Sequence, residues 1–284
     1  MLTSCKYILL YLFIFIVIYV SVSFISRYVI QYKLPREQTL QNSLHDDGFI
    51  LLDGVFNIHE LQVMRQYMKD KDSDQLKTFL FQHEQLQQTL RRCISSSSNL
   101  PVHEYEFQDY ILLINKSQIH TCHRDYNSDF YHDLKYPSFT FIIYLYDMSS
   151  CLDVVEKSHK YNRQFPYITD VSKHINCQIG DVLLFNANLL HAGSITNVHE
   201  NNPRIQMKFT HKDDRKVLSF YENYTKIVDK DINTSKIRDN VIKHFTCQHP
   251  FAQEIANKVY NYDTNKKEAP KWFLNLIYGN TSYL

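Results

Sequence analysis

The stretch GDVLLFNANLLHAGS, at residues 180–194, joins a tight turn, a short strand and a histidine. Gly180-Asp181 is typical of a turn, and the four apolar residues at 182–185 predict a strand buried on both faces. Comparable runs of β-branched and aromatic residues predict further strands at 49–52, 109–114, 138–146, 152–155, 175–178 and 204–210. Short strands at such close spacing are typical of a sandwich or barrel, so we expect a mainly β fold with flanking helices.

Helical patterns flank the predicted barrel in the sequence. Apolar residues recur at helical spacing over 58–68, and a glutamine-rich segment at 74–91 predicts a second helix. Beyond residue 211 the pattern turns helical again, notably at 235–245 and 251–260. The 284 residues are enough for one well-buried domain with an appendage. We expect a stalk, a core and a C-terminal helical extension packed on the core, at 28–44, 45–212 and 213–284.

No charged residue occurs between Tyr7 and Ile25, a run of 19 residues. A helix of about 20 apolar residues crosses a bilayer, whereas the apolar core of a cleavable signal peptide has about 7–15. The run therefore predicts an N-terminal transmembrane helix, with residues 1–27 as the anchor of a single-pass membrane protein. Its sidedness stays open, because the flanking basic residues favour a cytosolic body while four Asn-X-Ser/Thr sequences favour a lumenal one.

Charge and cysteine content exclude two classes of protein. The net charge of +1 predicts no concentrated basic surface, which disfavours a nucleic-acid partner. The six cysteines show neither a CxxC motif nor a paired spacing. This scattered set predicts reduced thiols rather than a disulfide framework.

His123 and Asp125 precede the strongest predicted strand and stand two residues apart. Side chains two apart along an extended strand share a face, so both can bind one ion while Arg124 points away. His191 follows another strong strand, and Arg204 begins the next one. Two imidazoles and a carboxylate suit a mononuclear Fe(II) site with open positions for an organic co-substrate and dioxygen, although similar ligands bind Zn or Mn. The forked guanidinium of an arginine suits the distal carboxylate of a dicarboxylic acid.

The same His-X-Asp spacing occurs twice more, at His45/Asp47 and at His211/Asp213. The first pair lies ahead of the first predicted strand, and no equivalent return strand follows it. The second pair lies beyond the last predicted strand and has no downstream basic partner. The middle pair is therefore the preferred candidate.

Three segments carry a resemblance to a known family. Residues 47–61 resemble its opening strand and helix, residues 151–160 its central loop, and residues 180–204 its closing hairpin. In this order, between residues 45 and 212, the chain resembles the phytanoyl-CoA dioxygenase-type members of the Fe(II)/2-oxoglutarate-dependent oxygenases. Two departures stand out: Glu156-Lys157 replaces the Pro-Gly that normally precedes Ser-His, and the closing interval up to Arg204 is longer than usual.

The resemblance implies a double-stranded β-helix core, the jelly-roll or cupin-like fold. It implies that His123, Asp125 and His191 are catalytic metal ligands for Fe(II), and that Arg204 and Ser194 bind 2-oxoglutarate. The expected reaction hydroxylates a small-molecule or lipid-like substrate and converts 2-oxoglutarate and O2 to succinate and CO2, with ascorbate as a candidate reductant. Residues 7–25 would place the substrate site near a membrane. The alternatives are a membrane-tethered, non-catalytic binding protein on the same fold and a different metalloenzyme, such as a zinc hydrolase.

Overall fold

The computed structural model describes residues 2–30, 34–96, 100–116, 123–160, 172–193, 201–228, 260–261 and 266–267. Its α-helices are α1 (Leu2–Ile30), α2 (Arg36–Gln41), α3 (Ile58–Asp70), α4 (Ser73–Phe81) and α5 (Glu84–Ser95). Short 3-10 helices are η1 (Val102–Glu104), η2 (Ser158–Lys160), η3 (Lys212–Asp214) and η4 (Ser219–Tyr221). The strands are β1 (Phe49–Leu52), β2 (Tyr105–Lys116), β3 (Phe139–Tyr144), β4 (Met148–Val154), β5 (Lys173–Cys177), β6 (Val182–Asn186), β7 (His191–Gly193), β8 (Asn201–His211), β9 (Tyr224–Val228), β10 (Tyr260–Asn261) and β11 (Lys266–Lys267).

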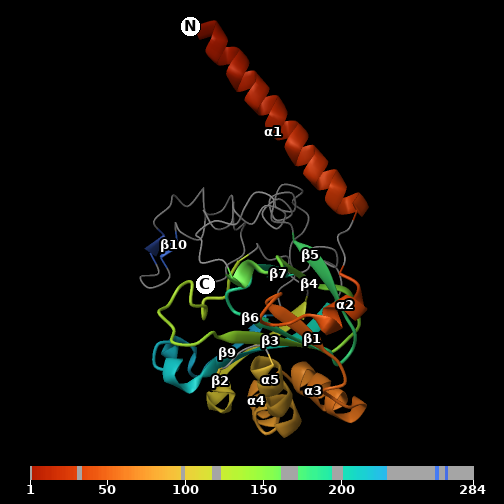
Figure 1. Ribbon diagram of the computed structural model, residues 1–284. Helices are drawn as coiled ribbons and strands as arrows, with labels where there is room; N and C mark the ends of the chain where they lie inside the picture. Colours follow the sequence, from red (N-terminus) through yellow and green to blue (C-terminus); the bar gives the residue numbers. More distant parts are fainter. Residues whose placement is uncertain are drawn as a thin grey trace.

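Strands β1 to β9 form two sheets, with the orders β1-β6-β3-β8-β2-β9 and β5-β4-β7 (Figure 1). Neighbouring strands are antiparallel except β9, which pairs in parallel with β2. From β5 to β8, successive strands alternate between the smaller and the larger sheet. This alternation is consistent with a jelly-roll core, and the prediction of a mainly β fold with flanking helices is confirmed.

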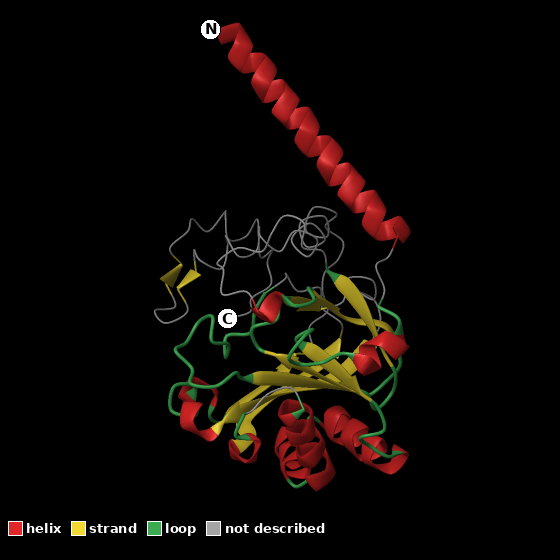
Figure 2. Cartoon of the chain, in the orientation of Figure 1, coloured by secondary structure: helices red, strands yellow, loops and turns green. Residues whose placement is uncertain are grey.

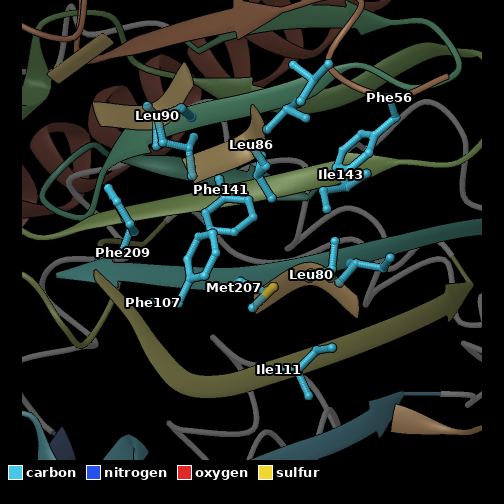
Figure 3. Packing of buried hydrophobic residues seen from close by; sticks show 14 of the residues in the cluster. Phe56, Leu80, Leu86, Leu90, Phe107, Ile111, Phe141, Ile143, Met207 and Phe209 are labelled. Carbon is cyan, nitrogen blue, oxygen red and sulfur yellow. The ribbon is translucent and has the colours of Figure 1, made fainter. Parts of the chain in front are cut away.

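The larger sheet is covered on both faces, which explains the composition of its strands. In β3, whose sequence is FTFIIY, every residue is buried. Phe141 and Ile143 pack into a cluster with Leu86 and other residues of α3–α5, on the face that Figures 2 and 3 show. Ile142 and Tyr144 pack with β4 and β5 on the opposite face. Because both faces are covered, the strand reads as a continuous apolar run instead of an alternating one.

The helices of the first third agree only partly with the sequence prediction. The helix predicted at 58–68 is confirmed by α3, whose N-terminus Asn57 caps. The single helix predicted at 74–91 is instead two helices, α4 and α5. His83 lies between them and caps α5, because its Nδ1 accepts the N–H of Leu86 at 3.1 Å. A side chain that caps a helix N-terminus starts a new helix at that residue. The spacing of apolar residues, on which the prediction of one helix is based, does not show such a break.

Residues 34–44, expected to belong to a polar stalk, pack against the body of the protein. Leu34 is buried, and its N–H donates to the carbonyl of His174 in β5 at 2.9 Å. Arg36, which begins α2, donates through Nη2 to Oδ1 of Asp181 at 2.8 Å, and its Nη1 contacts the other carboxylate oxygen. The folded core therefore includes this segment.

The prediction of a single-pass membrane protein anchored by residues 1–27 is wrong. Residues 7–25 lie in the helix α1. Within the described part of the chain, however, no helix is both long and apolar enough to span a membrane.

The segment after β8 contains strand as well as helix. Residues 212–228 form η3, η4 and then β9, which extends the larger sheet beside β2. The helix predicted at 235–245 lies outside the described residues, as does the helix predicted at 251–260 except for its last residue, which begins β10.

One pair of cysteines forms a disulfide, contrary to the prediction of reduced thiols. Cys151 of β4 and Cys177 of β5 are bonded, with their Cα atoms 5.9 Å apart. They are 26 residues apart in the sequence and meet because β4 and β5 pair antiparallel. The spacing of cysteines in the sequence could not predict this disulfide, because the two sulfur atoms meet only through the pairing of β4 with β5.

Candidate metal centre

Backbone hydrogen bonds place the segment containing His123 and Asp125 beside the connection from β6 to β7. His123 and His191 exchange both backbone bonds, N to O at 2.9 Å in each direction. The N–H of Asp125 donates to the carbonyl of Ala187 at 2.9 Å. These bonds hold two distant parts of the sequence in antiparallel register, so their side chains meet at one place between the two sheets.

Two imidazole nitrogens and one carboxylate oxygen converge at this place. Oδ1 of Asp125 lies 3.6 Å from Nε2 of His191 and 3.9 Å from Nε2 of His123. One ligand atom from each of the three residues lies within 4.8 Å of the others. Ligand atoms about 2.1 Å from a shared ion stand about 3 Å apart when they bind at right angles, so each pair has to close by no more than about 2 Å to bind a single ion. The donor set and its spacing fit a divalent transition metal.

The surroundings of His191 fix which of its nitrogens is available. Its Nδ1 lies 2.9 Å from the carbonyl oxygen of Leu189. A carbonyl can only accept, so Nδ1 carries the proton and Nε2 presents a lone pair toward Asp125. Burial lowers the pKa of His191 to about 4, and the neighbouring His123 adds to the effect. The ring is therefore neutral near pH 7, as a metal ligand must be.

Asp125 uses its two oxygens differently. Oδ1 faces the imidazoles, whereas Oδ2 accepts hydrogen bonds from the hydroxyl of Thr140 and from Nζ of Lys208, the latter at 2.7 Å. Burial opposes ionisation of the carboxyl, but the charge of Lys208, with smaller contributions from the two histidines, outweighs it and holds the pKa of Asp125 below its usual value. The carboxylate is thus ionised and held in one orientation.

Thr140 and Lys208 are functional candidates that sequence reasoning missed. Both are buried, and they are direct cross-strand neighbours in β3 and β8. Burial lowers the pKa of Lys208, and Asp125 opposes this shift. The signal in the sequence is the alternation RIQMKFT at 204–210, which turns every second, polar residue of β8 to one face.

Arg204 lies on the same face of β8 as Lys208. Ile205, Met207 and Phe209, which alternate with them, belong to the cluster on the helical side of the sheet. Lys208 lies four positions further along the strand than Arg204, or about 13 Å away. Arg204 is buried and stands opposite Tyr144 of β3. The guanidinium therefore lies between the sheets, displaced along β8 from the three candidate ligands.

Arg124 points away from the candidate ligands, as the alternation of an extended segment predicts. Its Nη1 donates to the carbonyl of Ser158 and to Oδ1 of Asn188, both at 3.1 Å. Oγ of Ser158 in turn accepts the N–H of Leu190 at 2.8 Å. Arg124 thus fastens the loop at 156–160 to the segment that leads into His191. Ser194, the second residue expected to bind 2-oxoglutarate, lies outside the described residues.

In the same loop, Lys157 adopts a backbone conformation that favours glycine. Its φ is 64°, and the resembled family has Gly at this position. The left-handed region costs a residue with a side chain about 1–2 kcal/mol, while glycine adds about 0.5–1 kcal/mol of unfolded-state entropy. We therefore expect Lys157→Gly to raise the free energy of unfolding by up to about 1.5 kcal/mol, measured by urea denaturation.

Gly54 provides the matched control for this prediction. Its φ is 62°, and a Cβ added there would meet no atom within 4 Å. Gly54→Ala should therefore lower stability through backbone strain alone. A Lys157→Gly protein that is less stable than the parent would contradict the argument.

A second group of three side chains, Glu104, His211 and Asp213, also has the spacing of a metal site. Nδ1 of His211 accepts the N–H of Asp213 at 3.2 Å, so the proton resides on Nε2, 3.0 Å from Oε2 of Glu104. Lys212 pairs with Glu104 at 2.8 Å, and Lys135 pairs with Asp213 at 2.7 Å. The nitrogen of His211 that faces Glu104 carries the proton and therefore offers no lone pair to a metal, so we interpret this group as a cluster of ion pairs.

No family model and no curated protein matches the chain, so the resemblance to the phytanoyl-CoA dioxygenase type is not confirmed. Among solved structures, the chain is similar to HygX from Streptomyces hygroscopicus with nickel and 2-oxoglutarate bound, at 20% identity and a TM-score of 0.47 over 63% of this chain and 87% of that one. It is similar to AviO1 from Streptomyces viridochromogenes at 15% identity and a TM-score of 0.46, over 63% and 96% of the two chains. SnoN, a non-heme α-ketoglutarate-dependent epimerase from nogalamycin biosynthesis, has 13% identity and a TM-score of 0.47, over 62% and 82%. At these identities and TM-scores the likeness carries no argument about the chemistry of this chain.

Proposed function

We propose that the protein is an Fe(II)/2-oxoglutarate-dependent oxygenase. The observation that supports it best is the convergence of Nε2 of His123, Nε2 of His191 and Oδ1 of Asp125. Three ligands of these types on one side of an ion leave positions open for a co-substrate and O2, which is the arrangement of non-heme iron oxygenases. When bound, the iron supplies O2 activation coupled to oxidative decarboxylation of 2-oxoglutarate.

In this proposal the chain holds the co-substrate at two points. The metal end of 2-oxoglutarate lies near Asp125, and its distal carboxylate binds the guanidinium of Arg204. Arg204 is buried on the face of β8 that Lys208 shares, and Lys208 contacts Asp125. A forked guanidinium pairs with both oxygens of a carboxylate, and burial strengthens that pair. Ser194 is proposed as a second donor to the same carboxylate.

The burial of the three ligands suggests where the prime substrate approaches. The side chains of Asp125 and His191 are 8% and 5% exposed, whereas that of His123 is 33% exposed. The open side of the centre is therefore the side of His123. We propose that a small-molecule substrate reaches the metal there and is hydroxylated, while the buried ligands keep bulk water from the opposite side.

The test is conversion of 2-oxoglutarate to succinate by the purified full chain with Fe(II) under air. We expect slow succinate formation without any prime substrate, dependent on both Fe(II) and O2. Substitution of Zn(II) should abolish it, since zinc has no redox chemistry. A protein that binds metal but forms no succinate across a substrate screen would contradict the proposal and favour a hydrolase or a non-catalytic binding protein. Mass spectrometry of the screened compounds, scored for the gain of one oxygen atom, identifies the substrate.

A further inference from the structure

We propose that Thr140 and Lys208 are positioning residues that present Asp125 to the metal through Oδ1 alone; this inference rests on the proposed function. Each of them donates a hydrogen bond to Oδ2 of Asp125. Lys208 also donates to the hydroxyl oxygen of Thr140 at 2.9 Å. The three side chains form a closed triangle of hydrogen bonds, and Oδ2 of Asp125 accepts two of the three.

The triangle prevents the carboxylate from turning. Two donors, one of them charged, occupy the lone pairs of Oδ2. If the carboxylate rotated to bind an ion with both oxygens, Asp125 would break both bonds and leave a buried ammonium without its carboxylate, which is strongly unfavourable. One-oxygen binding keeps a coordination position free, and the co-substrate needs that position.

The charges near the metal centre favour an anionic co-substrate. Lys208 neutralises Asp125, and the two histidines are neutral when they bind a metal. A divalent ion in this centre therefore keeps most of its positive charge, and Arg204 adds one more. This balance favours a dianionic ligand such as 2-oxoglutarate over a neutral one.

Structural need alone does not account for Lys208. Its backbone already pairs with β3 through an uninterrupted antiparallel ladder from Phe139↔Phe209 to Tyr144↔Arg204. Its ammonium lies 5.4 Å from the ring centroid of Tyr110 and 5.7 Å from that of Tyr221. In such a place apolar residues usually stabilise a fold as well as an ion pair does, or better. We therefore attribute the ammonium of Lys208 to its effect on Asp125, whose Oδ2 it holds by a hydrogen bond.

The experiment compares full-length wild type with Thr140→Val, Thr140→Ser and Lys208→Met. Valine preserves the shape of Thr140 and removes its hydroxyl, whereas serine keeps the hydroxyl and is the matched control. Each protein is loaded with Co(II), whose visible absorption reports coordination number, and 2-oxoglutarate is then titrated calorimetrically. Neither readout requires turnover.

We expect Thr140→Ser to match wild type in both measurements. Thr140→Val should change the Co(II) spectrum and weaken 2-oxoglutarate binding by about 10-fold, the lower end of the effect of losing a group that orients a metal ligand. Lys208→Met should change both in the same direction and by more. If Lys208→Met does not fold, Thr140→Val decides the question.

The inference is overturned if Thr140→Val and Lys208→Met keep the wild-type spectrum and affinity and differ only in thermal unfolding, because the triangle is then structural. With that result, the proposed function still stands as long as the wild-type protein binds Co(II) and 2-oxoglutarate. Wild type that does not bind Co(II) overturns the proposed function and this inference together.

Discussion

Replacing His191 with alanine is expected to abolish divalent-metal binding and 2-oxoglutarate consumption while the protein stays folded. Its Nε2 is one of three converging donors, and the lone pair there is fixed by the bond from Nδ1 to Leu189. Loss of a group that only orients a ligand costs about 10–100-fold in metal affinity, so loss of the ligand itself should cost more. Destabilisation of about 1–3 kcal/mol is expected from the vacated buried position.

His211→Ala is the matched control for this substitution. His211 is also fully buried, and it belongs to the second cluster with Glu104 and Asp213. The control should retain metal binding and turnover at wild-type levels, since its Nε2 is protonated. Metal binding is measured by Co(II) titration, turnover by succinate formation, and folding by circular dichroism. If the His211→Ala protein lost metal binding and the His191→Ala protein retained it, the metal would be bound at the second cluster and the account would be contradicted.

Replacing Arg204 with methionine is expected to raise the KM for 2-oxoglutarate by about 100-fold, because a buried carboxylate–guanidinium pair broken on one side costs about 2–5 kcal/mol. Co(II) binding should not change, since Arg204 is not among the converging ligands. Arg204→Lys should be intermediate, because an ammonium supplies the charge without the two-pronged geometry. The measurement is the rate of succinate formation as a function of 2-oxoglutarate concentration.

Arg215→Met provides the control for removing a positive charge. Arg215 is half-exposed and pairs with Glu106 at the surface, at 2.8 Å, so its loss should leave the KM unchanged. An Arg204→Met protein with wild-type KM would show that Arg204 has another role, as expected if the centre belongs to a different class of metalloenzyme.

The sequence was most informative where structure depends on neighbours along the chain. Runs such as FTFIIY predicted buried strands because both faces of the larger sheet are covered. The spacing of His123 and Asp125, together with the strand that ends before His191, predicted the cluster that the structure brings together. In each case the period of an extended chain determines which side chains share a face.

The sequence was least informative where structure depends on pairing between distant segments. Lys208 looked like an ordinary polar residue of a strand, and only the register of β8 with β3 places it beside Thr140. The disulfide between Cys151 and Cys177 likewise depends on the pairing of β4 with β5. The break between α4 and α5 depends on a histidine cap, which the apolar spacing does not record. The anchor prediction relied on the absence of charge over 7–25, and no membrane-spanning helix is found within the described residues.

The central claim is that His123, Asp125 and His191 bind one divalent ion. A crystal of the full chain soaked in Co(II), with diffraction recorded on both sides of the cobalt absorption edge, tests it most directly. The account predicts one strong anomalous peak bonded to Nε2 of both histidines and to Oδ1 of Asp125, with Oδ2 still bound by Lys208. A peak at Glu104, His211 and Asp213 instead, or an empty centre at full cobalt loading, would contradict it.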